Sequence, residues 1–348
     1  MSTPDSPASG REPAASYRPR QEGVNGFPRE RTVLLVIDPV NDFLSEGGAA
    51  WDLTKWTVKK HDVVGHLKQA IAGARERRVP VLFAPMAYTE EDYADRELQR
   101  RCGINRLMFE RKMFLAGSWG ADFHPDLQPR DDEAVLLPHK GIDVFETDLP
   151  DHLHRLGTTH LAIAGMTASL CCESTGRHAM EYGYDVTFLS DAIGADNPAA
   201  YEAAIRLNYP LIANAVLETE EFLAAIDGGE AAPVEPGDRV RGSDHGEIGT
   251  VRDVVEPSAQ TSGYLLVPRR RVFDRETYIP LDAVVKKAGG DVFVNIPKLI
   301  VGRMPWDAPP SPAEQDAKRG PRSGDVERLY RSREPSVRGG RGRTSGRD

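Results

Sequence analysis

Two hydrophobic patterns alternate along the first two thirds of the chain. Near-continuous apolar runs such as TVLLVIDPV (32–40) are typical of strands that are buried on both faces of a parallel sheet. Between these runs lie stretches such as HDVVGHLKQAIAGARERR (61–78), in which apolar residues recur at helical spacing. This pattern predicts strands over 32–40, 79–85, 133–140, 159–166 and 184–192, and helices over 61–78, 148–157, 171–183, 198–208 and 217–226. The alternation predicts an α/β fold with a doubly wound (Rossmann-like), mostly parallel sheet flanked by helices.

The composition changes near DGGEAAPVEPGD (227–238), where Gly, Ala, Pro and acidic residues replace the alternating pattern. Short β-like runs separated by turns follow, and these predict a small all-β, barrel-like domain. We therefore expect an α/β domain over 29–228, a linker over 229–236 and the β-domain over 237–304. The two ends, 1–28 and 305–348, are rich in Pro, Ser, Gly and Arg, and we expect both to be disordered tails.

The charge of −9 over 348 residues is unevenly distributed. The segment 318–348 has ten Lys or Arg and four Asp or Glu, so it carries +6 and the remainder −15. An acidic body makes nucleic acid an unlikely partner, although a basic tail can bind acidic surfaces as well as remain solvated. No apolar run approaches the roughly 18–20 residues that span a bilayer, and no secretory leader is visible. Three cysteines without metal-site or disulfide spacing indicate a reducing, cytoplasmic compartment.

Three residues with chemical potential fall at or just beyond the ends of predicted strands, where open α/β sheets bind their ligands. Cys171 opens a predicted helix, whose N-terminal N–H groups would help its thiol to ionise, although a buried and inert cysteine is the alternative. Asp38 could move the thiol proton, or could simply cap the next turn. Lys140 could lie near both groups and lower the pKa of the thiol, or could be a solvated surface lysine.

Four stretches together resemble the isochorismatase-like cysteine hydrolase superfamily over residues 31–226. They are LLVIDPVNDF (34–43), AGSWGADFHPDL (116–127), HKGIDVFETDL (139–149) and AGMTASLCCESTGRHAMEYGYDV (164–186). The resemblance implies that Asp38, Lys140 and Cys171 are the catalytic residues. It also implies a cis peptide between Met166 and Thr167, and an oxyanion hole formed by the backbone N–H groups of Thr167 and Cys171.

The activity that the resemblance implies is hydrolysis of a C–N bond in a small amide, ureido or carbamoyl compound. The bond would be cleaved through a thioester on Cys171, with release of ammonia or an amine, while Cys172 would be structural. Nicotinamidases of this family bind a metal through Asp and His residues after the second strand, but APMAYTEEDYAD (84–95) contains no histidine. We therefore expect no metal and no other cofactor.

Substrate-pocket residues are predicted by their position relative to the strands, although aromatic residues are more often part of a core. These residues are Asn41, Phe43, Tyr88, Trp119 and Phe145. Arg106 or Arg111 could bind a substrate carboxylate in a bidentate manner, or could be exposed.

The C-terminal β-domain resembles PRC-barrel-like modules, in PGDRVRGSDHGEIGTVRDVV (236–255) and in ETYIPLDAVV (276–285). Such modules usually mediate contacts, and we expect a homo-oligomer that acts on a small molecule, with no membrane partner. The alternative is a catalytically silent binding or scaffold protein that kept a hydrolase-like fold. A dinucleotide-binding enzyme is set aside because no GxGxxG follows the first strand.

Overall fold

The α/β domain is built on a six-stranded, fully parallel sheet with the strand order β3-β2-β1-β4-β5-β6. This computed structural model describes residues 27–227, 233–268, 276–288 and 290–311. The order is that of a doubly wound fold, so the predicted fold class is confirmed. The strands are β1 (Thr32–Ile37), β2 (Val81–Ala84), β3 (Ala134–Val135), β4 (His160–Gly165), β5 (Asp185–Ile193) and β6 (Ala215–Leu217).

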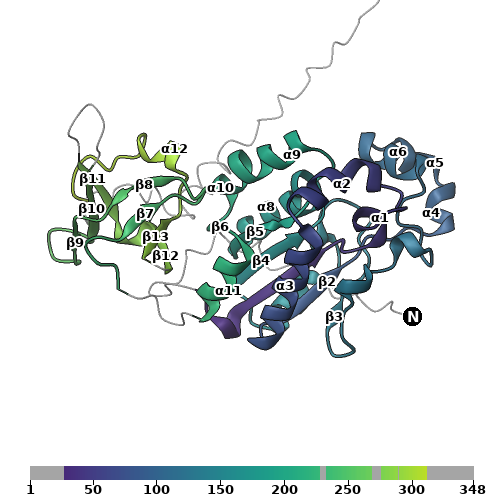
Figure 1. The fold of residues 1–348 in the computed structure, drawn as a ribbon, viewed down its shortest axis with the longest axis horizontal. Helices are drawn as coiled ribbons and strands as arrows, with labels where there is room; N and C mark the ends of the chain where they lie inside the picture. The colour runs from purple at the N-terminus through teal and green to yellow at the C-terminus, as the bar shows by residue number, and fades with distance from the viewer. Residues whose placement is uncertain (1–26, 228–232, 269–275, 289, 312–348) are drawn as a thin grey trace, which may run out of the picture.

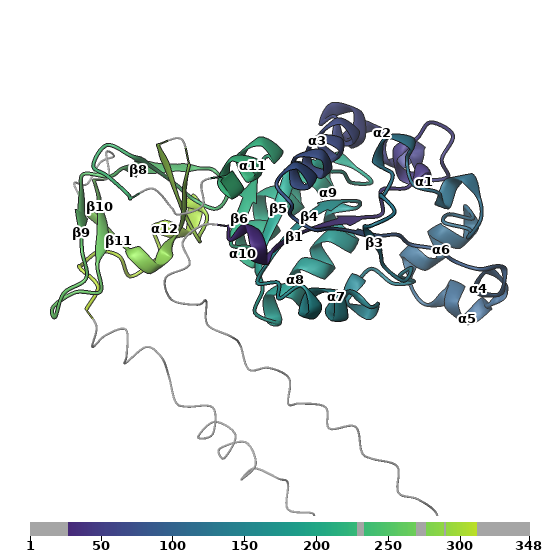
Figure 2. The same cartoon turned by 90° about the horizontal axis from the view of Figure 1, so that it is seen from below.

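Helices cover both faces of this sheet, as the two views in Figures 1 and 2 show. The helices α2 (Trp51–Lys60), α3 (Val63–Glu76) and α11 (Thr219–Asp227) pack on one face, and α7 (Leu149–Arg155) and α8 (Glu173–Glu181) on the other. Short helices lie beyond the carboxyl ends of the first two strands or after β5. They are α1 (Asn41–Leu44), α4 (Glu90–Ala94), α5 (Arg96–Arg100), α6 (Gly103–Glu110), α9 (Pro198–Ala203) and α10 (Tyr209–Ile212).

Every residue of the two central strands, β1 and β4, is buried, as their apolar runs predict. The third predicted strand is shorter than expected, because only Ala134 and Val135 pair with β2. The pattern also missed α2, the three short helices over 90–110 and β6, which has only three residues. The helix predicted from Cys171 onward begins instead as a π-type turn, Ala168–Cys172, which leads into α8.

A glycine sets the close approach of the two central strands at the edge that carries the site. Gly165, the last residue of β4, has φ +116, and a Cβ at this position would lie 1.9 Å from the carbonyl oxygen of Ile37. The next amide, that of Met166, donates to the same Ile37 oxygen at 2.9 Å. The ends of β1 and β4 are thereby held together, with the following residues side by side.

The C-terminal β-domain has its own hydrophobic core and two small sheets. One sheet has the order β11-β10-β9 and the other β12-β13-β7-β8. The strands are β7 (Arg239–Arg241), β8 (Glu247–Thr250), β9 (Asp253–Val255), β10 (Tyr264–Pro268), β11 (Glu276–Pro280), β12 (Val284–Ala288) and β13 (Asp291–Val294), and the helix α12 (Lys298–Val301) follows. The domain contacts the β6 edge of the parallel sheet through His245, whose ring bonds the carbonyl of Val216 and lies 3.5 Å from Glu221.

Two residues that the sequence pattern placed in the tails are packed against the domains. Phe27 is buried, with its ring edge-to-face against Phe222, and Trp306 is buried in the β-domain core, where its carbonyl accepts from Tyr278 N. An isolated aromatic side chain in a polar segment was therefore enough to anchor each end. The remaining parts of both predicted tails, and residues 229–232 of the predicted linker, lie outside the described residues. Within the described part of the chain, no helix is long and apolar enough to cross a bilayer.

We predict that Gly165→Ala destabilises the α/β domain by more than about 3 kcal/mol, because the new methyl group would overlap the Ile37 carbonyl. The matched control is Gly157→Ala, which also has a positive φ, +62, but has nothing within 4 Å of the added Cβ. It should cost about 1 kcal/mol of backbone strain alone. Urea unfolding followed by circular dichroism measures both, and equal losses would contradict the steric explanation.

Candidate functional site

Three buried side chains meet at the carboxyl edge of the parallel sheet: Asp38, His139 and Cys171. One potential ligand atom from each lies within 4.8 Å of the other two. Asp38 follows β1, His139 follows β3 and Cys171 follows β4, so the site draws on three strand ends, as predicted for such folds. Two of the three predicted catalytic residues are therefore together, and the third member is a residue that the sequence analysis missed.

Asp38 occupies a strained and fully enclosed position. Its φ is +50, unusual for a residue other than glycine, and its side chain is fully buried. The amide of Asp38 donates to the carbonyl of Ala84 at 2.9 Å, which fixes its backbone to the end of β2. The oxygen Oδ1 lies 3.0 Å from His139 Nε2, while Oδ2 has no hydrogen-bond partner in the described chain. One carboxylate oxygen is thus held and the other is available to a proton.

His139 has an oxygen atom at each ring nitrogen. Nδ1 lies 2.6 Å from the carbonyl of Gly141, and Nε2 lies 3.0 Å from Asp38 Oδ1. A neutral imidazole has a single N–H, so only the doubly protonated cation can donate both hydrogen bonds. Burial opposes this charge, but Asp38 and the Gly141 carbonyl outweigh it, so the pKa of His139 lies above its ordinary value. The two oxygen neighbours and the raised pKa therefore both favour the imidazolium form of His139.

Lys140 does not lie in this cluster, and the expectation that its ammonium would sit near Asp38 and Cys171 is wrong. Its Nζ is 2.6 Å from Asp92 Oδ2, and the side chain is half exposed. Successive side chains of an extended segment point to opposite sides, so His139 faces inward and Lys140 outward. The sequence PHK (138–140) has two adjacent basic residues, and this could have indicated that His139, rather than Lys140, is the residue that faces the cluster.

Cys171 lies in the π-type turn that follows β4, and its side chain is buried in the cluster. The preceding peptide between Met166 and Thr167 is cis, as the resemblance implied. Burial and the nearby Asp38 carboxylate raise the pKa of Cys171 well above its ordinary value, and a hydrogen bond from the backbone N–H of Thr167 only partly offsets them. The thiol is therefore neutral at rest, contrary to the expectation that the turn would make it ionise. Cys172 is completely buried among core residues, as predicted.

A small cavity, which we call the inner cavity, opens onto Cys171 and Thr167. Its walls are mostly apolar and come from α1, α2, α6 and the loops after β2 and β3; they include Phe43, Leu53, Met86, Leu107, Phe114 and Ile142. Phe43 was predicted to line the substrate pocket and does line this cavity. The Cys171 side chain therefore lies at the wall of the inner cavity.

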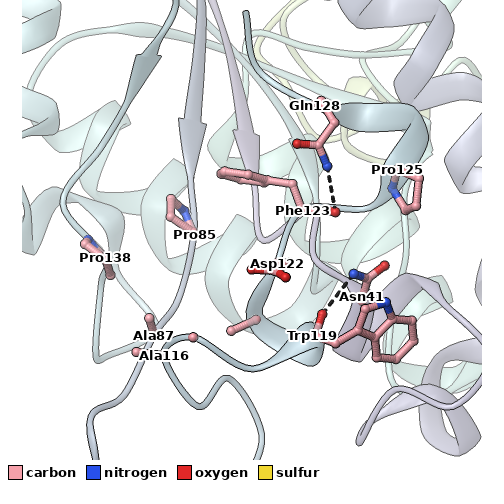
Figure 3. A pocket seen from close by; sticks show the side chains of 12 residues that line it. Asn41, Pro85, Ala87, Ala116, Trp119, Asp122, Phe123, Pro125, Gln128 and Pro138 are labelled. Atoms are coloured by element: carbon pink, nitrogen blue, oxygen red, sulfur yellow. Dashed lines mark hydrogen bonds between the residues drawn. The ribbon is translucent and has the colours of Figure 1, made fainter. Parts of the chain in front are cut away.

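The other predicted pocket residues lie elsewhere. Asn41 and Trp119 line a separate outer hollow of about 700 Å³, where the Asn41 amide donates to the Trp119 carbonyl at 2.9 Å (Figure 3). Tyr88 is fully buried, with its hydroxyl bonded to the Lys140 carbonyl. Phe145 stacks on His178, with ring centroids 4.5 Å apart, because it faces α8.

The arginines considered for a substrate carboxylate are also outside the inner cavity. Arg111 is bound to Asp52, with one guanidinium nitrogen 2.5 Å from the carboxylate, and Arg106 is exposed. Arg106 and Arg111 were considered because of their charge alone. The groups that an arginine contacts depend on tertiary structure, which charge does not reveal.

The donor set of Asp38, His139 and Cys171 also has the composition of a metal-binding group. In the structure, however, the ring nitrogen and the carboxylate oxygen that would bind an ion face each other as an ion pair. In the segment after β2, where a family metal site was considered, Asp92 forms a capping box with Thr89 at the start of α4 and pairs with Lys140. His152 pairs with Asp148 on α7 at 3.4 Å.

Comparison with known proteins gives matches over the α/β domain. The sequence profile of the isochorismatase domain matches residues 32–221. A ureidoacrylate amidohydrolase of Pantoea ananatis is 28% identical over 211 residues, which cover 58% of this chain and 84% of that protein. One of Methylorubrum extorquens is 27% identical over 240 residues, covering 64% and 93%. A solved cysteine hydrolase of Pseudomonas syringae aligns with a TM-score of 0.49 at 20% identity, over 60% of this chain and all of its own.

We predict that the ion pair between His139 and Asp38 stabilises the fold at low pH and loses this effect as the pH rises. The folded-state pKa of His139 is raised, so the stabilisation is complete below the ordinary value of 6.5 and disappears as the pH passes the raised value. His139→Gln should cost on the order of 3 kcal/mol at pH 6 and distinctly less at pH 10. Urea unfolding at both pH values measures the difference.

The control is His152→Gln, which removes a partly exposed pair with Asp148 and should cost less than about 1 kcal/mol. A cost of His139→Gln that stays constant with pH would show that His139 is neutral in the folded protein.

Proposed function

This chain belongs to the isochorismatase family, and we propose that it is an amidohydrolase that cleaves a C–N bond with Cys171 as its nucleophile. The observation that carries the proposal is the meeting of Cys171, Asp38 and His139 at one cavity. The ureidoacrylate amidohydrolases to which the chain is similar support a ureido, carbamoyl or other small amide as substrate. A catalytically silent scaffold would have no need of a strained, buried carboxylate beside a thiol.

The first chemical step follows from the neutral state of the thiol. As Cys171 Sγ attacks the substrate carbonyl carbon, its proton passes to the unpartnered Oδ2 of Asp38. The N–H of Thr167, which already reaches the sulfur, and the N–H of Cys171 would hold the developing oxyanion. Collapse of the tetrahedral intermediate breaks the C–N bond, and the departing nitrogen takes the proton from Asp38. Water then attacks the resulting thioester, with Asp38 accepting its proton and returning it to the sulfur.

His139 supplies the positive charge that the sequence analysis assigned to Lys140. A protonated His139 lies against the buried Asp38 carboxylate, and it would favour the sulfur anion that forms as the thiol proton leaves. Either cation performs this role only while it keeps its proton. An imidazolium ordinarily loses its proton at a lower pH than an ammonium, whose ordinary pKa is near 10.4. We therefore propose that His139 makes the reaction sensitive to alkaline pH.

We predict that Cys171→Ala abolishes hydrolysis, lowering kcat/KM by at least about 10⁴-fold, while Cys172→Ala retains most of it. The measurement is ammonia release across a panel of small amides, ureides and carbamoyl compounds. Cys172 is the matched control, because it is the adjacent buried thiol. If the panel gives no ammonia with the wild-type chain, or if Cys172→Ala is the inactive variant, the proposed chemistry is wrong.

We predict that the alkaline limb of the pH–rate profile follows the deprotonation of His139. His139→Lys should keep a cation at this position and move the alkaline limb upward by more than about one pH unit. His139→Gln should lose about 10²-fold or more of kcat/KM. The control Lys140→Met removes an exposed cation paired with Asp92 and should keep activity within about twofold. Loss of activity in Lys140→Met with none in His139→Gln would return the catalytic role to Lys140.

A further inference from the structure

The inner cavity is lined by an acidic residue that does not belong to the catalytic cluster. Its volume is about 40 Å³, enough for the reacting group of a small molecule, and most of its lining side chains are apolar. Apart from Cys171, its one ionisable lining residue among those described is Asp196, in the loop between β5 and α9. No Lys, Arg or His is among these lining residues.

Two polar atoms in this lining are buried without a hydrogen-bond partner in the described part of the chain. They are Asp196 Oδ1 and Thr167 Oγ1. A buried polar atom without a partner typically costs about 1–3 kcal/mol, so such atoms need an explanation. A carboxylate oxygen can only accept hydrogen bonds, so the group that satisfies Asp196 must be an N–H or O–H donor.

The charge of Asp196 is not balanced within the cavity. Asp38 and His139 form an ion pair whose charges sum to zero, and the Cys171 thiol is neutral at rest. The carboxylate of Asp196 therefore sets the sign of the potential in a mostly apolar space, where charges are poorly screened. A substrate carboxylate would meet a like charge there and no cation to bind it.

We propose that Asp196 selects the substrate: a small amide with an otherwise apolar body that carries an N–H donor and no carboxylate. This inference rests on the proposed function and refines it. It distinguishes the chain from the relatives that it resembles, whose named substrate, ureidoacrylate, is an acid. Asp196 accepts the N–H of the substrate, and the apolar walls enclose the remainder.

Alkylation of Cys171 by two small reagents of matched size tests this charge preference without a known substrate. Iodoacetamide is itself a small primary amide, whereas iodoacetate is its anionic counterpart. In both cases the sulfur displaces iodide and the thiol proton is released. The exposed Cys102 in the same molecule is the internal reference for the intrinsic reactivity of each reagent. Fragment-ion mass spectrometry separates Cys171 from the adjacent Cys172.

In the wild-type chain, Cys171 should react with iodoacetamide about tenfold or more faster than with iodoacetate, after division by the Cys102 rates. In Asp196→Asn this preference should fall to within about twofold. The control Asp122→Asn removes a carboxylate that lines the outer hollow instead (Figure 3), and it should keep the wild-type ratio. A cationic reagent, 2-bromoethylamine, should react faster with Cys171 than with Cys102 in the wild-type chain. This advantage should disappear in Asp196→Asn and persist in Asp122→Asn.

Three results would overturn the inference: equal normalised rates for the two reagents, a ratio that Asp196→Asn leaves unchanged, or a Cys171 that iodoacetamide cannot reach. These results are separable from failure of the proposed function. Charge-selective alkylation without turnover of any amide would refute the hydrolase and keep the selectivity of the cavity. Turnover that favours carboxylate-bearing amides would keep the hydrolase and refute the role of Asp196.

Discussion

The buried ion pair between His139 and Asp38 is the interaction on which the rest of the site depends. Both side chains are fully enclosed, and removing two charges from water costs several kcal/mol per ion before their attraction is counted. Buried pairs of this kind seldom stabilise a protein more than well-packed apolar residues would. Asp38 also holds a left-handed backbone conformation, which adds strain. Asp38 therefore combines a buried charge with a strained backbone beside the Cys171 thiol. A catalytic role explains this combination better than a contribution to stability does.

The parallel sheet supplies the backbone frame that makes this pair possible. Hydrogen bonds continue past the strand ends: Asp38 N donates to Ala84 O, and His139 N donates to Pro85 O. On the other side of β1, Met166 N donates to Ile37 O, and Gly165 allows the close approach. The three loops therefore leave the sheet in fixed register. The side chains that follow converge because the strands end at one edge of the sheet, although Asp38 lies more than a hundred residues before His139 and Cys171 in sequence.

This frame also explains how much could be predicted from the sequence. The long apolar runs predicted β1 and β4, and a carboxylate and a thiol just past those runs marked the carboxyl edge. The third partner could not be assigned, because β3 is very short and the register of His139 against Met86 is a tertiary contact. A shift of one residue in an extended segment exchanges the inward and outward faces, and here it exchanged His139 and Lys140. Phe27 and Trp306 were missed for a related reason, since their partners are distant in sequence.

The protonation states divide the catalytic roles in a way that differs from a simple cysteine–histidine pair. Both ring nitrogens of His139 have an oxygen within hydrogen-bond distance, so a doubly protonated ring that donates to both has no lone pair with which to accept the thiol proton. Burial and the Asp38 carboxylate raise the pKa of Cys171, which disfavours a thiolate formed in advance. Among the described residues of the cluster, Asp38 Oδ2 is therefore the available base. When the proton moves from sulfur to Asp38, the negative charge moves from the carboxylate to the sulfur. A protonated His139 lies beside both groups, so the anion keeps a cationic neighbour during this step.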